Sequence, residues 1–344
     1  MNVPVKLLVT ATAGLVALPA VVAAHHSMAE FDRGTVTELD GEVVTVAWRN
    51  PHIRLDVETT DARGASVVWN LEGSAVSAQR RHGVEGGLVE VGDHVRIAGW
   101  PSTRRANHLL VNHVLLPDGV ELLVGSVREP RWSATSVGSD SLVIDPEKAA
   151  AAEGSGLFRV WTRGTPAWYF AGGANYRLTA EAEAAQAEYD DLRDNPLRRC
   201  IPPGMPALIG NPYPMELVER GGNVEIRFEE FDVARTLHID AAVDPATVQL
   251  SPLGYTVAHW EGETLVARTT RIDWPYFNRV GATQSQDVVV DERFTAVDGG
   301  RRLDYVMTVT DPATLVEPFV WEAYWTWEPG EEVGRYDCTV EAYR

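Results

Sequence analysis

The chain has 344 residues, with 49 acidic side chains against 30 basic ones, and its formal net charge is −19. Hydrophobic residues make up 45% and charged residues 23%, which is ordinary for a globular protein and excludes wholesale disorder. The excess of acid argues against a nucleic-acid partner and against docking on anionic lipid, because both need a concentrated basic surface.

The first residues have the pattern of an export signal. Lys6 precedes an apolar run from Leu7 to Leu18, and small residues at 22–24 offer a cleavage site. We therefore expect residues 1–24 to be a cleaved signal peptide and the mature protein to be periplasmic, with no membrane anchor. A retained transmembrane anchor is the alternative, which Pro19 and the two histidines that follow the run weaken.

Cleavage after residue 24 would leave His25 and His26 at the new terminus. A free α-amino group beside imidazole nitrogens suits Cu(II), and His52 is a candidate further ligand. The sequence therefore predicts copper as a candidate cofactor, although the fold requires none. The alternative is a solvated terminus that binds no metal.

Three strands, a short helix and two further strands are predicted between residues 34 and 124. Ile53, Leu55 and Val57 alternate with charged residues, which is the pattern of a half-buried strand. This order of elements is that of an OB-fold barrel. We expect residues 25–124 to form a small OB-like barrel that serves as an accessory module or docks a periplasmic protein partner.

Four motifs in this region carry a resemblance to a known family: HHSMAEFD at residues 25–32, WRNPH at 48–52, VGD at 91–93 and LPDG at 116–119. Together they resemble the exported bacterial family DUF6152, with Met28 at a position where that family usually has Phe. The family is uncharacterised, so the resemblance implies export and a fold, and it implies no reaction.

Residues 125–199 are predicted to be a partly helical connector. A short helix is expected at residues 145–152, and a second helix is expected to run from Thr179, its N-cap, to residue 194. The apolar side of the second helix is thin, so we expect it to lie on the surface of a domain.

The last domain, residues 200–344, is predicted to be an antiparallel β-barrel or sandwich of the lipocalin-like kind. Eight strands are expected, at residues 224–228, 234–240, 256–260, 264–270, 288–294, 303–310, 319–327 and 336–341. This half also resembles a recurrent, uncharacterised β domain of exported bacterial proteins. The motifs that carry this second resemblance are LGY at 253–255, WEGETLV at 260–266, ERF at 292–294 and TDP at 310–312.

The chain has two cysteines, Cys200 and Cys338. An even count in an oxidising compartment favours one disulfide, which would join the start of the last domain to its end. Two separate buried thiols are the alternative.

Large aromatic side chains gather on one face of the strand at residues 319–327. Trp321, Trp325 and Trp327 share that face, where they either fill a core or line a cavity for a small apolar or aromatic ligand. An apolar loop is a candidate lid over the barrel mouth, and one hairpin supplies a further aromatic residue. The added candidate ligand-binding residues are Trp274, Tyr276 and Phe277 in the loop and Trp260 in the hairpin.

His238 and Asp240 share one face of their predicted strand and could form an oriented general base. They support a third hypothesis, a barrel-cavity enzyme of the hydratase, isomerase or cyclase type. No nucleophile motif accompanies them, and a purely structural hydrogen bond is the alternative. The sequence leaves open whether any reaction is catalysed. Ligand binding in the barrel is the leading hypothesis, with copper binding second.

Overall fold

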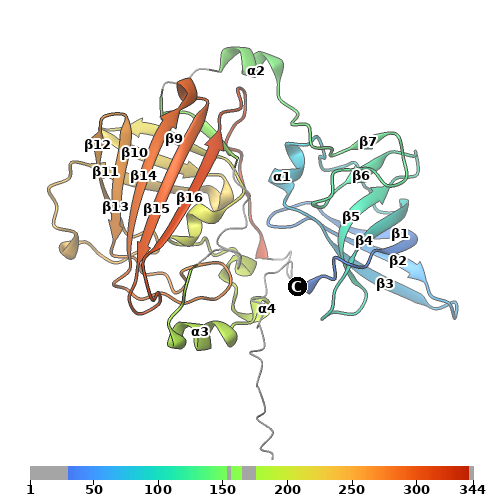
Figure 1. Cartoon of the computed structure of the whole chain (residues 1–344). Helices are drawn as coiled ribbons and strands as arrows, with labels where there is room; N and C mark the ends of the chain where they lie inside the picture. The colour runs from blue at the N-terminus through green and yellow to red at the C-terminus, as the bar shows by residue number, and fades with distance from the viewer. Residues whose placement is uncertain (1–29, 153–155, 165–175, 341–344) are drawn as a thin grey trace, which may run out of the picture.

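The computed structural model describes residues 30–152, 156–164 and 176–340. The predicted signal peptide and the pair His25 and His26 lie outside this part. The fold is mainly β, and two barrels stand side by side with a connector between them (Figure 1). We call them the N-terminal barrel and the C-terminal barrel. Both were predicted as separate β units, and the structure confirms this fold class.

The N-terminal barrel is closed by five strands of the described chain and has the predicted OB-like order. Its elements are β1 (Thr37–Ala47), β2 (Arg54–Thr60), β3 (Ser66–Glu72), α1 (Val76–Arg80), β4 (His94–Pro101), β5 (His108–Leu115), β6 (Glu121–Leu123) and β7 (Ser136–Val137). β1 pairs with β2 and β4, and a parallel pairing of β3 with β5 closes the ring. β6 and β7 extend the sheet beyond β5.

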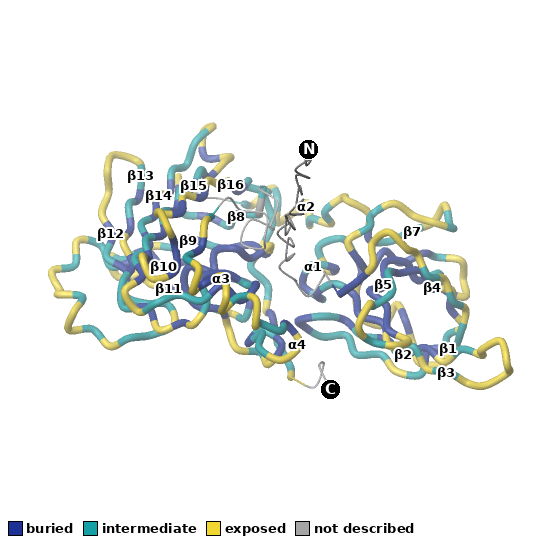
Figure 2. Tube along the Cα trace, turned by 60° about the horizontal axis from the view of Figure 1, so that its bottom comes forward, coloured by how far each residue is buried: buried dark blue, intermediate teal, exposed yellow. Residues whose placement is uncertain are grey.

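Alternation along β2 explains how this barrel acquires its core. Leu55 and Val57 are at most 1% exposed, whereas Arg54, Asp56 and Glu58 between and beside them are not buried. Burying one face of a strand in this way is favourable at roughly 25 cal/mol per Å² of apolar surface. The same division into a buried inside and an exposed outside runs through both barrels (Figure 2).

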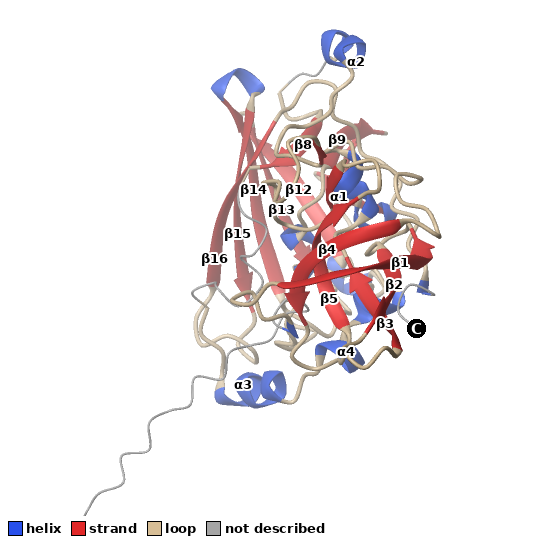
Figure 3. Ribbon diagram, turned by 90° about the vertical axis from the view of Figure 1, so that its right-hand side faces the viewer, coloured by secondary structure: helices blue, strands red, loops and turns tan. Residues whose placement is uncertain are grey.

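The connector contains α2 (Pro146–Ala151), the strand β8 (Val160–Arg163), α3 (Ala180–Ala187) and α4 (Asp191–Asp194). The side chain of Thr179 caps α3 as predicted, and the side chain of Asp145 caps α2. The single helix expected from Thr179 to residue 194 is two helices. The carboxylate of Asp190 accepts the amide proton of Leu192 and so starts α4 as a separate helix. Figure 3 shows α2 and α3 at opposite ends of the molecule.

The C-terminal barrel is closed by nine of the described strands. They are β8 together with β9 (Met215–Arg220), β10 (Asn223–Phe228), β11 (Val233–Ile239), β12 (Tyr255–Glu261), β13 (Thr264–Thr270), β14 (Val289–Val297), β15 (Arg302–Thr310) and β16 (Phe319–Thr326). Their order around the barrel is β10-β11-β12-β13-β14-β15-β16-β8-β9. Neighbours are antiparallel except β11 and β12, which run parallel.

The predicted strand at residues 336–341 is not a strand over its described part. It is an extended segment that runs between the two barrels, with one bridge from Cys338 to Asn50. Its hydrogen-bonding partners belong to both barrels and do not form a continuous strand edge. β8 and β9, which were not among the predicted strands of the last domain, close the barrel in its place.

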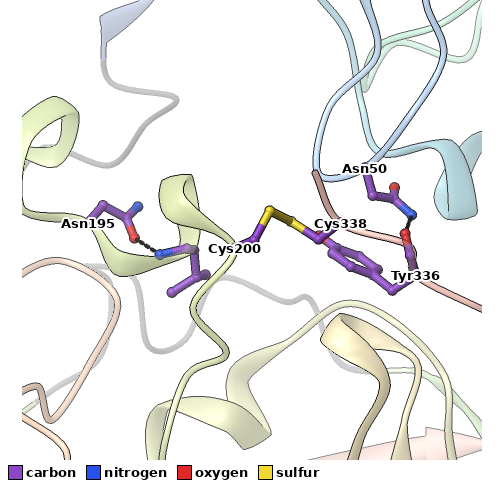
Figure 4. The surroundings of a disulfide bond; sticks show 6 residues. Asn50, Asn195, Cys200, Tyr336 and Cys338 are labelled. Carbon is purple, nitrogen blue, oxygen red and sulfur yellow. Dashed lines mark hydrogen bonds between the residues drawn. A yellow bond between two sulfur atoms is a disulfide. The ribbon is translucent and has the colours of Figure 1, made fainter. Parts of the chain in front are cut away.

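The predicted disulfide between Cys200 and Cys338 is present (Figure 4). It joins a short 3₁₀ helix, Pro196–Arg199, to the segment between the barrels. In the part of the chain that the structure covers, no helix is both long and apolar enough to cross a membrane.

Candidate binding site in the C-terminal barrel

A fully buried ion pair lies inside the C-terminal barrel. Arg235 on β11 contacts Glu292 on β14, and their side chains are 2% and 0% exposed. One guanidinium nitrogen, Nη1, donates to Glu292 Oε1 at 3.0 Å, and Nη2 donates to Oε2. The two planar groups therefore meet as a bidentate pair, the geometry in which an arginine–carboxylate contact is strongest.

Hydroxyl groups from three other strands complete the shell around this pair. Thr269 Oγ1 accepts from Arg235 Nη2 at 2.6 Å, and Thr256 Oγ1 accepts from the same nitrogen at 3.1 Å. The Tyr305 hydroxyl donates to Glu292 Oε1 at 2.8 Å. Burial alone would lower the pKa of Arg235, but the Glu292 carboxylate outweighs burial and holds that pKa above its usual value. Arg235 is therefore a permanent cation inside the barrel.

Aromatic rings stand directly beside the polar group. Tyr305 packs edge-on against Trp321 and Trp325, with ring centroids 5.8 and 5.4 Å apart, and its ring is tilted on Phe294 at 4.9 Å. Trp321 and Trp325 are each 2% exposed. Of the predicted aromatic wall, the structure thus places these two inside the barrel, next to a charged pair that was not predicted.

Trp327 and Trp260 lie at the end of the barrel where β16 finishes. Trp327 follows β16 and sits beneath the guanidinium of Arg159, 4.3 Å from its ring centroid. Trp260 is 40% exposed, and Phe158 approaches it edge-on at 6.2 Å. These rings therefore form the rim of the barrel and not its centre.

Trp274, Tyr276 and Phe277 lie at the opposite end, in the loop between β13 and β14. Phe277 is fully buried and packs on Phe319, and Tyr276 packs on Tyr189 of the connector. The predicted apolar loop packs against the barrel at this end, and its role as a lid stays a prediction. It is also fastened there, because Gln186 of α3 donates to a carbonyl of this loop at 3.1 Å.

His238 lies on the outer face of β11, next to Leu237, which is buried inside. Asp240 follows the last residue of that strand with a left-handed φ of 47°, so it does not continue the outer face as predicted. The ring of His238 stacks on Tyr255 at 4.7 Å, and Asp240 is exposed. The structure therefore does not bring this pair into the barrel interior.

Of the predicted copper ligands, only His52 falls in the described residues. Its Nδ1 lies 2.9 Å from the carbonyl oxygen of Gly73 and 3.7 Å from the carboxylate of Glu72. The described part of the chain contains no group of three or more His, Cys, Asp or Glu side chains placed to hold a metal ion.

A cleft of about 400 Å³ lies between the two barrels and brings together none of the predicted site residues. Arg81 of the N-terminal barrel reaches across it to Glu229 and Glu331. Burial raises the pKa of Glu331, although Arg81 partly opposes that rise. Most charged side chains of this cleft form ion pairs with one another. We therefore place the candidate site in the C-terminal barrel.

The alternation of residues along the strands could have identified Arg235 and Glu292. Arg235 is two residues from the buried Leu237, so both point to the same side of β11. Glu292 likewise points to the same side of β14 as the buried Val290 and Phe294. A charged residue at an inward position of a strand needs a buried partner, and two such residues of opposite sign suggest each other.

Neither a curated protein nor a solved structure was found to match the chain. A family model does match part of it, and the matched segment covers most of the N-terminal barrel. This confirms the predicted resemblance and leaves the C-terminal barrel to be interpreted from its own residues. Through residues 13–110, the N-terminal segment of the chain matches the family described as "Family of unknown function (DUF6152)".

Proposed function

We propose that this is an exported periplasmic protein that binds a small, partly apolar or aromatic ligand inside its C-terminal barrel. The observation that carries the proposal is the Arg235–Glu292 pair, which sits in the barrel interior with Tyr305 and two tryptophans beside it. Binding pockets commonly combine such apolar walls with a few convergent polar groups.

Stability alone gives little reason for this pair. A buried ion pair must offset the loss of hydration of both ions, and apolar residues of similar volume often do as well or better. The pair is better explained by ligand binding: together with the Tyr305 hydroxyl, it would orient one polar group of a ligand. The tryptophans would then contact the apolar part of the ligand.

We place the entrance at the rim that carries Trp260 and Trp327. At the other end, the loop that holds the buried Phe277 packs against the barrel. Trp260 is 40% exposed and so is available to an approaching ligand. Trp325 lies between this rim and Tyr305, whose ring it contacts.

Two observations support the periplasmic address. The first 24 residues have the pattern of a signal peptide. The Cys200–Cys338 disulfide fits an oxidising compartment, where such bonds persist.

Binding can be tested with the neutral fluorescent probe N-phenyl-1-naphthylamine, whose emission rises in apolar sites. We expect the purified protein to bind the probe and Trp325→Leu to weaken that binding about tenfold, the equivalent of 1.4 kcal/mol. Tyr324→Leu is the matched control, because Tyr324 is the neighbouring residue and points outward. A folded Trp325→Leu protein with unchanged affinity would contradict the proposal.

Native mass spectrometry of protein purified from periplasm is the second measurement. We expect a chain that lacks its first 24 residues and carries the mass of a bound small molecule, which is lost on denaturation. A chain recovered uncleaved from the cytoplasm would contradict the export part, while leaving the probe experiment to decide the binding part.

A further inference from the structure

The segment that follows β16 runs between the two barrels (Figure 1), and we call its residues 334–339 the strap. On the side of the C-terminal barrel, the amide of Gly334 donates to Glu229 Oε2 at 2.9 Å. The amide of Tyr336 donates to Asp232 Oδ1 at 3.1 Å. Both acceptors are side chains of the turn between β10 and β11, so the strap adds no rung to the β-ladder there.

The same strap is hydrogen-bonded to Asn50 of the N-terminal barrel. The Asn50 side-chain amide donates to the carbonyl oxygen of Tyr336, and the Asn50 carbonyl accepts the amide proton of Thr339 at 3.2 Å. Asn50 is 3% exposed and lies in the WRNPH motif of the matched family segment. The strap therefore ties the two barrels to each other.

An aromatic ring fills the space between the barrels. Tyr336 is 2% exposed and packs on Tyr213 and Phe231, with ring centroids 5.4 and 4.8 Å apart. Ala75, at the start of α1 in the N-terminal barrel, belongs to the same apolar cluster. Tyr336 therefore contributes to an apolar cluster that contains residues of both barrels.

The strap is fastened covalently at its end by the bond from Cys338 to Cys200 (Figure 4). Both cysteines are only half-buried, so a small dithiol can reach them. Cys200 and Asp337, the residue before Cys338, hold left-handed backbone angles of φ 56° and 45°. Residues other than glycine adopt such angles at a cost, which favours relaxation once the bond is broken.

Direct ion pairs also cross the junction. Arg104 contacts Asp190 at 2.7 Å with both side chains partly exposed, and Arg81 contacts Glu229. The Arg104–Asp190 pair is exposed, so it is weak and is screened by salt, whereas Arg81 and Glu229 are only 13% and 1% exposed. The disulfide of the strap is a covalent tie, which salt does not weaken.

We propose that the Cys200–Cys338 disulfide is a redox-operated lock on the strap, and that a dithiol reductant opens it and lets the two barrels separate. One thiolate of the reductant attacks a sulfur of the disulfide and forms a mixed disulfide, which its second thiol resolves. The reductant is oxidised to a disulfide, and its two electrons, with two protons, leave Cys200 and Cys338 as thiols. The released strap uncovers Tyr213 and Phe231.

Hydrogen exchange of the full mature protein tests the lock, with dithiothreitol as the dithiol. In the oxidised protein we expect the amides of Tyr336 and Thr339 to be protected, since each has an acceptor. Reduction should accelerate their exchange at least tenfold, while peptides of β14 and β15 stay protected over the same first minutes. Small-angle scattering at 0.5 M NaCl should show a larger radius of gyration in the reduced protein only.

The variant Cys200→Ser/Cys338→Ser should exchange like the reduced protein and should not respond to dithiothreitol. Equal strap exchange in the oxidised and reduced proteins would overturn the proposal. Equal acceleration in β14 and β15 would also overturn it, because the bond would then support the fold of the barrel and not control a local release.

Discussion

The side-chain amide of Asn50 donates a hydrogen bond to the backbone carbonyl of Tyr336, which lies 286 residues further along the chain. Both residues are buried, at 3% and 2% exposure. The contact joins a turn that carries a motif of the matched family segment to the last described segment of the protein. A local motif of one domain thus has its partner in another.

Asn50→Ala is the first test of this contact. The substitution leaves the Tyr336 carbonyl buried without its donor, and an unsatisfied buried group costs about 1–3 kcal/mol. We expect a loss of that size in the free energy of unfolding, measured by urea titration. Asn70→Ala is the matched control, because the Asn70 side chain bonds Asp56 at an exposed site and its loss should cost less than about 0.5 kcal/mol. Equal losses in the two variants would contradict the assigned role of Asn50.

The fold of the N-terminal barrel could be predicted because its signals are local. The alternation of Leu55 and Val57 with charged residues fixes which face of β2 is buried, and Asp61 with Gly64 makes the turn to β3. The segment around Tyr336 could not be predicted in the same way. Its alternation resembles a strand, but its partners lie on two different domains and nothing in the nearby sequence indicates them.

The candidate site was predictable only in its apolar part. Trp321 and Trp325 share a face of one strand, which their spacing shows. Arg235 and Glu292 are 57 residues apart, on strands that are not neighbours in the barrel, so their contact depends on closure of the whole sheet. A charged residue in a strand is ordinarily expected to face water, so neither Arg235 nor Glu292 was predicted to be buried.

Glu292→Gln should be strongly destabilising. It leaves Arg235 buried without an anion, and breaking a buried ion pair by removing one partner costs about 3–5 kcal/mol. Arg235→Met/Glu292→Met removes both charges, and we expect it to be more stable than Arg235→Met or Glu292→Met alone. Urea unfolding of the wild-type protein, Arg235→Met, Glu292→Met and the double variant gives the coupling energy of the pair.

Asp291→Asn is the control for this cycle, since Asp291 is the preceding residue on β14 and pairs with Arg268 at an exposed site. Its expected cost is below about 1 kcal/mol. A Glu292→Gln protein as stable as this control would show that water reaches the pair, which would contradict its burial.

Tyr305→Phe isolates the hydroxyl group of the site. The hydroxyl donates to Glu292 Oε1 at 2.8 Å, and a hydrogen bond to a charged group contributes about 1.5–3 kcal/mol. We expect a loss in this range in urea unfolding, together with weaker binding of N-phenyl-1-naphthylamine. Tyr255→Phe, on the outer face of the barrel beside His238, should lose less than about 0.5 kcal/mol. The order of the two losses decides whether the Tyr305 hydroxyl matters to the site.

Acid should destabilise the N-terminal barrel through Glu121. This carboxylate is fully buried and accepts the amide protons of Arg131, Trp132 and Ser133 at 2.7, 2.8 and 2.9 Å. Burial alone would raise the pKa of Glu121, but these donors and His113 outweigh burial and hold the pKa below its ordinary value of 4.5. The pKa values of Glu30 and Glu72 in the same barrel are lowered as well.

A lowered folded pKa fixes the sign of the effect. The unfolded chain takes up a proton near pH 4.5 while the folded Glu121 does not, so its contribution is complete above pH 4.5 and is lost as the pH falls toward the folded pKa. Glu121→Gln should therefore flatten the fall in urea stability below pH 4.5, and it should not abolish that fall, because Glu30 and Glu72 remain. Glu85→Gln, which removes an exposed carboxylate of the same barrel, gives the baseline. If urea stability falls as steeply below pH 4.5 in Glu121→Gln as in this control, the three amides do not stabilise the ionised carboxylate of Glu121.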